Sequence, residues 1–150
     1  MSCNSRGVTL IELLLVMALI GAIMVIAYPS MQPVLSKRTL ESDANKLAWT
    51  LRNARQKAIT TGKPQMVKFY PHSNMYYYDG ELIKLSDNIR YIGATTFSKT
   101  ASGDRLCSFS SQGRPSHGGT VTLGDDHQHR MYIIVNPVGG RVRVSTEPPK

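Results

Sequence analysis

An apolar run near the N-terminus constrains this chain more than any other feature. It extends from Val8 to Tyr28 and reads VTLIELLLVMALIGAIMVIAY. As a helix it is long enough to cross the roughly 30 Å of hydrocarbon in a bilayer, which takes about 20 residues. A secretory signal peptide, the first alternative, has an apolar region of only about 7–15 residues and normally no charge within it. The run therefore predicts a transmembrane helix at residues 8–28.

Glu12 lies inside this apolar run. An ionised side chain inside a bilayer costs roughly 2.5–3.5 kcal/mol on insertion scales, so it usually has a partner and a function. An ordinary membrane anchor, the second alternative, explains the length of the run but not its glutamate. We therefore expect Glu12 to have a specific role.

A short polar leader, MSCNSRG, precedes the run and ends in Gly7. It carries one positive charge, Arg6, and a cation just before a span favours keeping that end in the cytoplasm. We expect a single-pass protein of the inner (plasma) membrane with a cytoplasmic N-terminus. Residues 29–150 then form an extracytoplasmic domain.

The segment RGVTLIEL, from Arg6 to Leu13, resembles the prepilin signal of type IV pilins and type II secretion pseudopilins. In that family a membrane aspartyl peptidase, the prepilin peptidase, cuts after the glycine and methylates the new amino terminus. The resemblance implies that residues 1–7 are a cleaved leader and that the cut falls between Gly7 and Val8. Val8 would become the methylated first residue, where the family usually has phenylalanine.

The same resemblance places Glu12 at the glutamate position of the family, the fifth residue of the mature chain. Apolar helices bundled in a filament exclude water, and a buried carboxylate there needs a positive charge. The proposed partner in the family is the amino terminus of the neighbouring subunit, here that of Val8. Such a pair would fix the register between subunits, as polar groups in apolar seams do. The alternative is that Glu12 reaches the membrane interface near the start of the helix.

A second helical pattern follows the apolar run. Gly62 and Pro64 are predicted to end the helix near Thr61, and Pro29 and Pro33 are expected to interrupt or kink it. We expect one long helix over about residues 9–61, amphipathic in its second half. Small and apolar residues recur there at spacings of three and four, which is typical of a helix with one buried face: Leu40, Ala44, Leu47, Leu51, Ala54 and Ala58.

The rest of the chain alternates short β-type segments with turns. Asp79-Gly80 is a typical hairpin turn, and the alternation indicates an antiparallel sheet with one covered face. The predicted class is therefore α+β, a long N-terminal helix packed on a C-terminal antiparallel β-sheet. Strands are predicted at eight places: residues 65–70, 75–78, 81–85, 89–92, 106–110, 120–123, 131–135 and 141–145.

Two C-terminal segments, FSSQGRPS from Phe109 and GRVRV from Gly140, resemble the GspH/FimT-type minor pilins and pseudopilins. The resemblance implies a structural subunit that assembles with other pilin or pseudopilin subunits. It could serve a type II secretion pseudopilus, a type IV pilus or a competence pilus, because the shared features build the subunit and do not select its machine.

Arg141 and Arg143 are candidate DNA-binding residues. Two residues apart on a strand, their side chains point to one face, and guanidinium groups bind phosphates well. The net charge of +8 favours an anionic partner, and some members of the resembling family bind DNA for natural transformation through a glycine–arginine–x–arginine motif. The alternative is that both arginines keep an edge strand soluble. Further cations lie on the helix: Lys37, Arg38, Arg52, Arg55 and Lys57.

Other candidate chemistry is weak. The run Asp125-Asp126-His127-Gln128-His129 has metal-ligating side chains, but a hairpin tip usually holds solvated aspartate and histidine. We predict no metal and no cofactor. No nucleophile–base pairing is readable, so we predict that the protein is not an enzyme. Cys107 is expected to be a small core residue.

Overall fold

A computed structural model describes residues 9–93, 95–99 and 103–149, with the side chains of 26–30 left out. The predicted processing residues Gly7 and Val8 lie outside the described residues. The chain divides into two compact units at the boundary between Leu35 and Ser36, and each is considered by itself.

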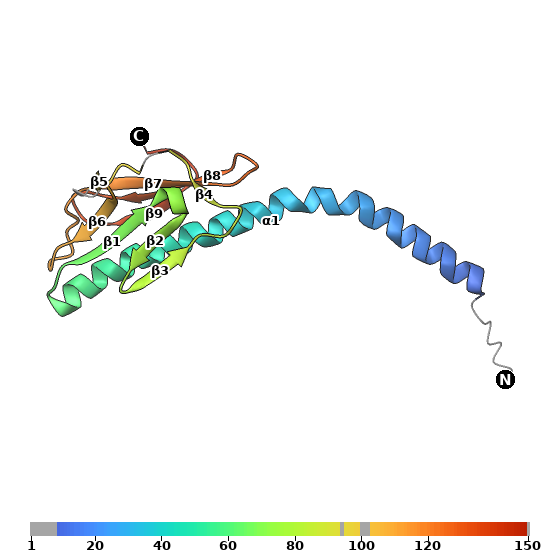
Figure 1. Cartoon of the computed structure of the whole chain (residues 1–150), viewed down its shortest axis with the longest axis horizontal. Helices are drawn as coiled ribbons and strands as arrows, with labels where there is room; N and C mark the ends of the chain where they lie inside the picture. Colours follow the sequence, from blue (N-terminus) through green and yellow to red (C-terminus); the bar gives the residue numbers. More distant parts are fainter. Residues whose placement is uncertain (1–8, 94, 100–102, 150) are drawn as a thin grey trace. The chain divides into compact units, whose positions relative to one another are not determined.

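Helix α1 (Leu10–Thr61) is the only element of the first unit among the described residues, and it continues into the second (Figure 1). Both Pro29 and Pro33 lie within its bounds, so the predicted interruption of the helix at these prolines is wrong. Its first turns expose large apolar side chains, among them Leu10 at 77% and Val25 at 75%. Within the described ranges, no helix is long and apolar enough to qualify as a membrane span.

In the second unit, the part of α1 from residue 36 to 61 packs on the sheets through the predicted stripe. Every residue of that stripe, from Leu40 to Ala58, is at most 1% exposed. The helix ends as predicted, with Gly62 in the left-handed region at φ +65°. Two large apolar side chains on the same segment point to solvent instead: Trp49 is 63% exposed and Ile59 is 41% exposed.

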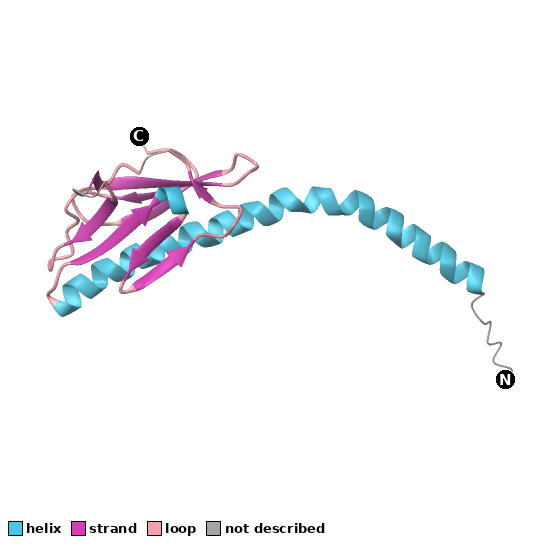
Figure 2. Ribbon diagram, viewed as in Figure 1, coloured by secondary structure: helices cyan, strands magenta, loops and turns pink. Residues whose placement is uncertain are grey.

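The strands after α1 form two antiparallel sheets, where a single sheet was predicted (Figure 2). The five-stranded sheet has the order β3-β2-β1-β6-β5, and the four-stranded sheet has the order β4-β7-β8-β9. Two elements were not predicted, the short strand β5 and the 3-10 helix η1. The bounds are as follows: β1 (Gln65–Tyr70), η1 (Pro71–Ser73), β2 (Met75–Tyr78), β3 (Glu81–Lys84), β4 (Arg90–Tyr91), β5 (Ser98–Lys99), β6 (Arg105–Phe109), β7 (Gly119–Gly124), β8 (Arg130–Val135) and β9 (Val142–Ser145).

One core joins α1 to both sheets. The predicted hairpin is present, because β2 and β3 pair across Asp79-Gly80 with Tyr78 opposite Glu81. Cys107 faces the core from β6, opposite Val67 of β1, and among the described residues it forms no disulfide. The largest fully buried side chains come from the helix and from both sheets: Leu40, Leu47, Leu51, Val67, Phe69, Ile89, Phe97, Phe109, Val121, Leu123, Ile133 and Val135.

Candidate functional site

The two candidate DNA-binding arginines lie at the start of β9, the outer strand of the four-stranded sheet. Arg141 directly precedes the strand and Arg143 is its second residue. Both side chains are exposed, whereas Val142 between them is 6% exposed. This alternation agrees with the orientation expected from the sequence.

Arg141 also lines an open groove of about 680 Å³ between α1 and the start of β9. We call this the arginine groove. Arg52 and Arg55 of α1 line it as well, so three arginines line one hollow. Among the described residues that line it, there is no aspartate or glutamate. The full lining is as follows: Trp49, Arg52, Asn53, Arg55, Gln56, Gly140, Arg141 and Val142.

Hydrogen bonds to backbone carbonyls hold two of these arginines in place. Arg52 Nη2 donates to the carbonyl oxygen of Val142 at 3.2 Å. Arg55 Nε donates to the carbonyl oxygen of Gly113 at 3.1 Å. Each guanidinium has further N–H groups, so it remains able to bind an anion while its position is fixed.

Gly113 and Gly140 lie beside Arg55, and both have a left-handed backbone conformation that favours glycine. Gly140 has φ +63°, and a Cβ there would lie 2.7 Å from the Gly113 carbonyl oxygen and 3.1 Å from Arg55 Nε. Gly113 has φ +73°, and its Cβ would lie 2.6 Å from Ile59 Cδ1. These are the glycines of the two C-terminal segments recognised in the sequence. Gly140 lies against the Gly113 carbonyl and Arg55, whereas Gly113 lies against the side chain of Ile59.

Ordered turns carry both glycines to this position. In the first turn, Ser110 N donates to the Arg114 carbonyl oxygen at 2.8 Å, and Gly113 N donates to the Ser110 carbonyl oxygen at 2.8 Å. In the second, Gly140 N donates to the Asn136 carbonyl oxygen at 2.9 Å. Asn136 Oδ1 also accepts from Val138 N at 2.9 Å. The backbone turns beside the arginine groove are therefore held in place by hydrogen bonds.

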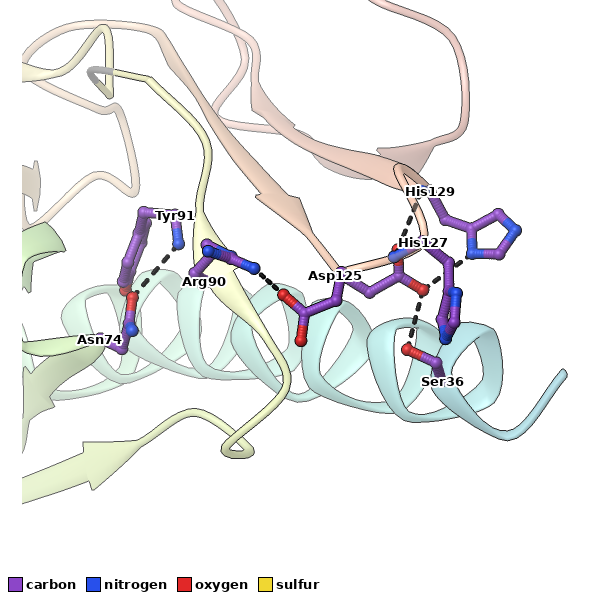
Figure 3. Close-up of polar contacts among 8 residues, drawn as sticks. Ser36, Asn74, Arg90, Tyr91, Asp125, His127 and His129 are labelled. Atoms are coloured by element: carbon purple, nitrogen blue, oxygen red, sulfur yellow. Dashed lines mark hydrogen bonds and ion pairs between the residues drawn. The ribbon is translucent and has the colours of Figure 1, made fainter. Parts of the chain in front are cut away.

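Asp125 forms a second polar cluster, at the tip of the β7–β8 hairpin (Figure 3). Its carboxylate accepts from Ser36 Oγ of α1 at 2.8 Å and from His129 N at 2.8 Å. His129 Nδ1 lies 2.7 Å from the same carboxylate, and His127 N also donates to it at 3.0 Å. The side chain of Asp125 is 0% exposed, so the prediction of a solvated residue is wrong for it.

The ionisation of Asp125 reflects two opposing effects. Burial disfavours the charged carboxylate, but the hydrogen bonds from His129 and Ser36 outweigh it and hold the pKa of Asp125 below its usual value. The neighbouring Asp126 forms an ion pair with Arg90 of β4. Through its hydrogen bond with Ser36, Asp125 joins the β7–β8 hairpin to α1.

Within the described part of the chain, no group of three or more His, Cys, Asp or Glu side chains could hold a metal ion.

Glu12 lies in the first turn of α1 and is exposed. Its backbone N–H donates to Thr9 Oγ1 at 3.3 Å. Thr9 therefore caps the helix, and Thr9 and Glu12 have the spacing of a capping box. This Thr-x-x-Glu signature was not among the features predicted from the sequence. The role of Glu12 in assembly stays a prediction.

Two family models match separate segments of the chain. The model of the prokaryotic N-terminal methylation motif matches residues 2–28, and that of the Type II transport protein GspH matches residues 43–139. Arg141 and Arg143 lie outside both matches. No curated protein matches the chain.

Two solved structures share the fold. The minor pseudopilin EpsH from the type 2 secretion system of Vibrio cholerae has 12% sequence identity and a TM-score of 0.56, covering 71% of this chain and 95% of its own. The type IV minor pilin FimU of Pseudomonas aeruginosa has 12% identity and a TM-score of 0.52, covering 75% of this chain and 92% of its own. A helix packed on antiparallel sheets is thus common to all three.

Proposed function

The chain belongs to the family of the Type II transport protein GspH, and from this premise we propose that it is a minor pilin or pseudopilin. In this role it is a structural subunit of a type II secretion pseudopilus or a type IV pilus, and it is not an enzyme. One observation carries the proposal: a methylation motif at residues 2–28 directly precedes a GspH domain at residues 43–139. The order is that of a subunit processed at its N-terminus before it assembles.

Processing follows from the methylation motif. The prepilin peptidase cuts between Gly7 and Val8, removes residues 1–7 and methylates Val8. Before assembly the chain is anchored in the inner membrane as a single-pass protein, with its N-terminus in the cytoplasm. Its partners are then the peptidase, the membrane and the other subunits of the filament.

The exposed apolar side chains of the first unit support this topology. Large hydrophobic residues from Leu10 to Val25 are exposed on every side of α1, with Leu10 at 77% and Ile20 at 42%. Apolar surface of this extent marks a segment that is covered by lipid or by protein partners. A membrane covers it before assembly, and the helices of neighbouring subunits cover it in the filament.

Glu12 offers the test of assembly. We expect Glu12→Leu to be inserted and processed like wild type but incorporated poorly into filaments, because the partner of the neighbouring amino terminus is lost. Glu12→Gln is the matched variant, since glutamine keeps the capping-box pattern with Thr9 and removes only the charge. Incorporation is measured by immunoblotting of sheared filaments from cells that also express the wild-type subunits.

The two variants separate assembly from helix capping. If the charge is what matters, both variants are excluded from filaments. If Glu12→Gln is incorporated normally and Glu12→Leu is not, capping is the role of Glu12 and the register pair is refuted. Normal incorporation of both would refute any role for Glu12 in assembly.

DNA binding by Arg141 and Arg143 is the alternative function. Both arginines are exposed, Arg143 on β9 and Arg141 directly before it, which supports it. Replacing both with glutamine is expected to lower duplex affinity and to reduce the salt slope by up to about two units. Absence of duplex binding by the wild-type chain at low salt would leave the structural role alone.

A further inference from the structure

We propose that the arginine groove binds carboxylate side chains presented by another protein subunit of the filament. The inference rests on the proposed function, because the partner is taken to be a filament subunit. It specifies the chemistry of one docking site. In this site, guanidinium groups beside an exposed tryptophan bind an acidic polypeptide segment.

The cations of the groove are arranged for carboxylates. Arg52 and Arg55 are each held by a backbone carbonyl, at 3.2 Å and 3.1 Å, so little side-chain freedom remains to be lost on binding. Arg141 is exposed at the rim. Planar guanidinium groups bind carboxylates with two parallel hydrogen bonds. In the described lining of the groove no acidic residue neutralises them.

Five of the ten carboxylates of this chain are engaged in ion pairs elsewhere. Asp43 pairs with Lys46, and Asp79 pairs with Lys57. Asp87 pairs with Lys84. Asp126 and Asp125 are held by Arg90 and His129. With 18 lysines and arginines against 10 aspartates and glutamates, the anion for the groove comes more readily from a different protein than from a second copy.

Trp49 distinguishes a polypeptide from other anions. It lines the arginine groove and also an adjoining open groove of about 740 Å³, whose walls include Thr50, Tyr76 and Ile83. Cationic and apolar surfaces thus meet at one exposed tryptophan. Tryptophan and arginine are the residues most enriched at the energetic centres of protein interfaces. An aliphatic wall such as Ile83 suits an apolar side chain next to the acidic one, which a nucleic-acid backbone lacks.

The first experiment uses Trp49 as the reporter, because the chain contains one tryptophan. The full chain in detergent micelles is titrated with the acetylated, amidated peptide Asp-Glu-Leu-Asp-Glu, and Trp49 fluorescence is recorded. We expect a saturable change. Arg141→Gln is expected to weaken binding about tenfold or more, since hydrogen bonds between charged groups are lost. Arg130→Gln is the matched control, an exposed arginine on β8 outside the groove, and it should bind like wild type.

Two reference ligands make this titration decisive. The amide isostere Asn-Gln-Leu-Asn-Gln should cause no saturable change. The proposal is overturned if the acidic peptide gives no saturable change up to millimolar concentration, or if the isostere acts equally. It is also overturned if a single-stranded oligothymidylate binds more tightly than the peptide and loses its affinity in Arg141→Gln. That result would assign the groove to nucleic acid.

The second experiment identifies the partner in native membranes. In Arg141→Lys the new amine can form an amide with a contacting carboxylate when a carbodiimide is added, so only groups in direct contact are joined. We expect mass spectrometry to show position 141 linked to an aspartate or glutamate of another filament subunit. A link to the same chain alone, or none while other lysines react, would overturn the proposal. Cleavage after Gly7 does not involve the groove, so failure here leaves the proposed function intact.

Discussion

Gly140→Ala is the sharpest perturbation of the second unit. Gly140 has φ +63°, and a Cβ at this position would lie 2.7 Å from the Gly113 carbonyl oxygen and 3.1 Å from both Arg55 Nε and Pro115 Cδ. The closest of these atoms belongs to the backbone, which cannot rotate away. We therefore expect the substitution to displace the turn that carries Gly113 and to break the hydrogen bond from Arg55 Nε to the Gly113 carbonyl oxygen.

The magnitude follows from two contributions. A residue with a Cβ in the left-handed region costs about 1–2 kcal/mol, and forcing extra atoms into a packed site costs about 1–3 kcal/mol. Because relaxation of the turn relieves part of both, we expect the free energy of unfolding to fall by about 2–4 kcal/mol. With a urea m-value of about 2 kcal/mol/M, the middle of the range for small proteins, the midpoint should fall by roughly 1–2 M.

The assay is urea unfolding of the full chain in detergent, followed by the fluorescence of Trp49. Gly139→Ala is the matched control, because a Cβ at Gly139 would meet no described atom within 4 Å and its φ lies outside the left-handed region. We expect Gly139→Ala to change the free energy of unfolding by about 0.5 kcal/mol or less. Equal midpoints for both alanine variants would refute the close packing of Gly140 against the Gly113 carbonyl and Arg55.

Two further groups in the second unit give predictions. At pH 7, Asp125→Asn should lower the free energy of unfolding by about 1–3 kcal/mol. In the folded state, hydrogen bonds hold the pKa of Asp125 below its usual value. The stabilisation by Asp125 is therefore present above the usual pKa and is lost as the pH falls through the folded pKa. The difference between variant and wild type, measured by urea unfolding, should therefore shrink below about pH 4. Burial raises the pKa of the Cys107 thiol to about 12, so at pH 8 iodoacetamide should alkylate it slowly in the folded chain and rapidly in urea, as mass spectrometry can follow. Rapid alkylation of the folded chain would contradict its burial.

Local periodicity made much of the fold predictable. The stripe on α1 and the alternation along β1 and β2 depend on neighbours within a few residues, and the structure confirms both. The end of α1 at Thr61 and the Asp79-Gly80 hairpin are likewise decided by local backbone chemistry. These elements could be located from the sequence for that reason.

The division into two sheets could not be predicted. Alternation shows which face of a strand is buried, but the choice of neighbouring strand depends on contacts far apart in the chain. β5 was missed because Ser98 and Lys99 are too few to show a pattern, and their pairing with Leu106 and Arg105 of β6 defines the strand.

In the candidate site, too, only the features with a local sequence signal were predictable. The sequence identified Arg141 and Arg143 and the glycines beside them, but not the groove. Arg55 and Gly113 are 58 residues apart, and Ser36 and Asp125 are 89 residues apart, so no local signal relates them. Trp49 lies on the polar face of α1, where its exposure becomes evident only once the sheets are placed.

The mature N-terminus tests the proposed function most directly. The chain is purified from membranes of the native host and its intact mass is measured. A processed filament subunit is expected to have the mass of residues 8–150 with one added methyl group, and fragmentation should place the methyl group on the amino group of Val8. A mass that corresponds to a chain starting at Met1 would contradict the assignment to pilins and pseudopilins. So would a mass that corresponds to a cut after Ala22 or Ala27, as a secretory signal peptidase would make.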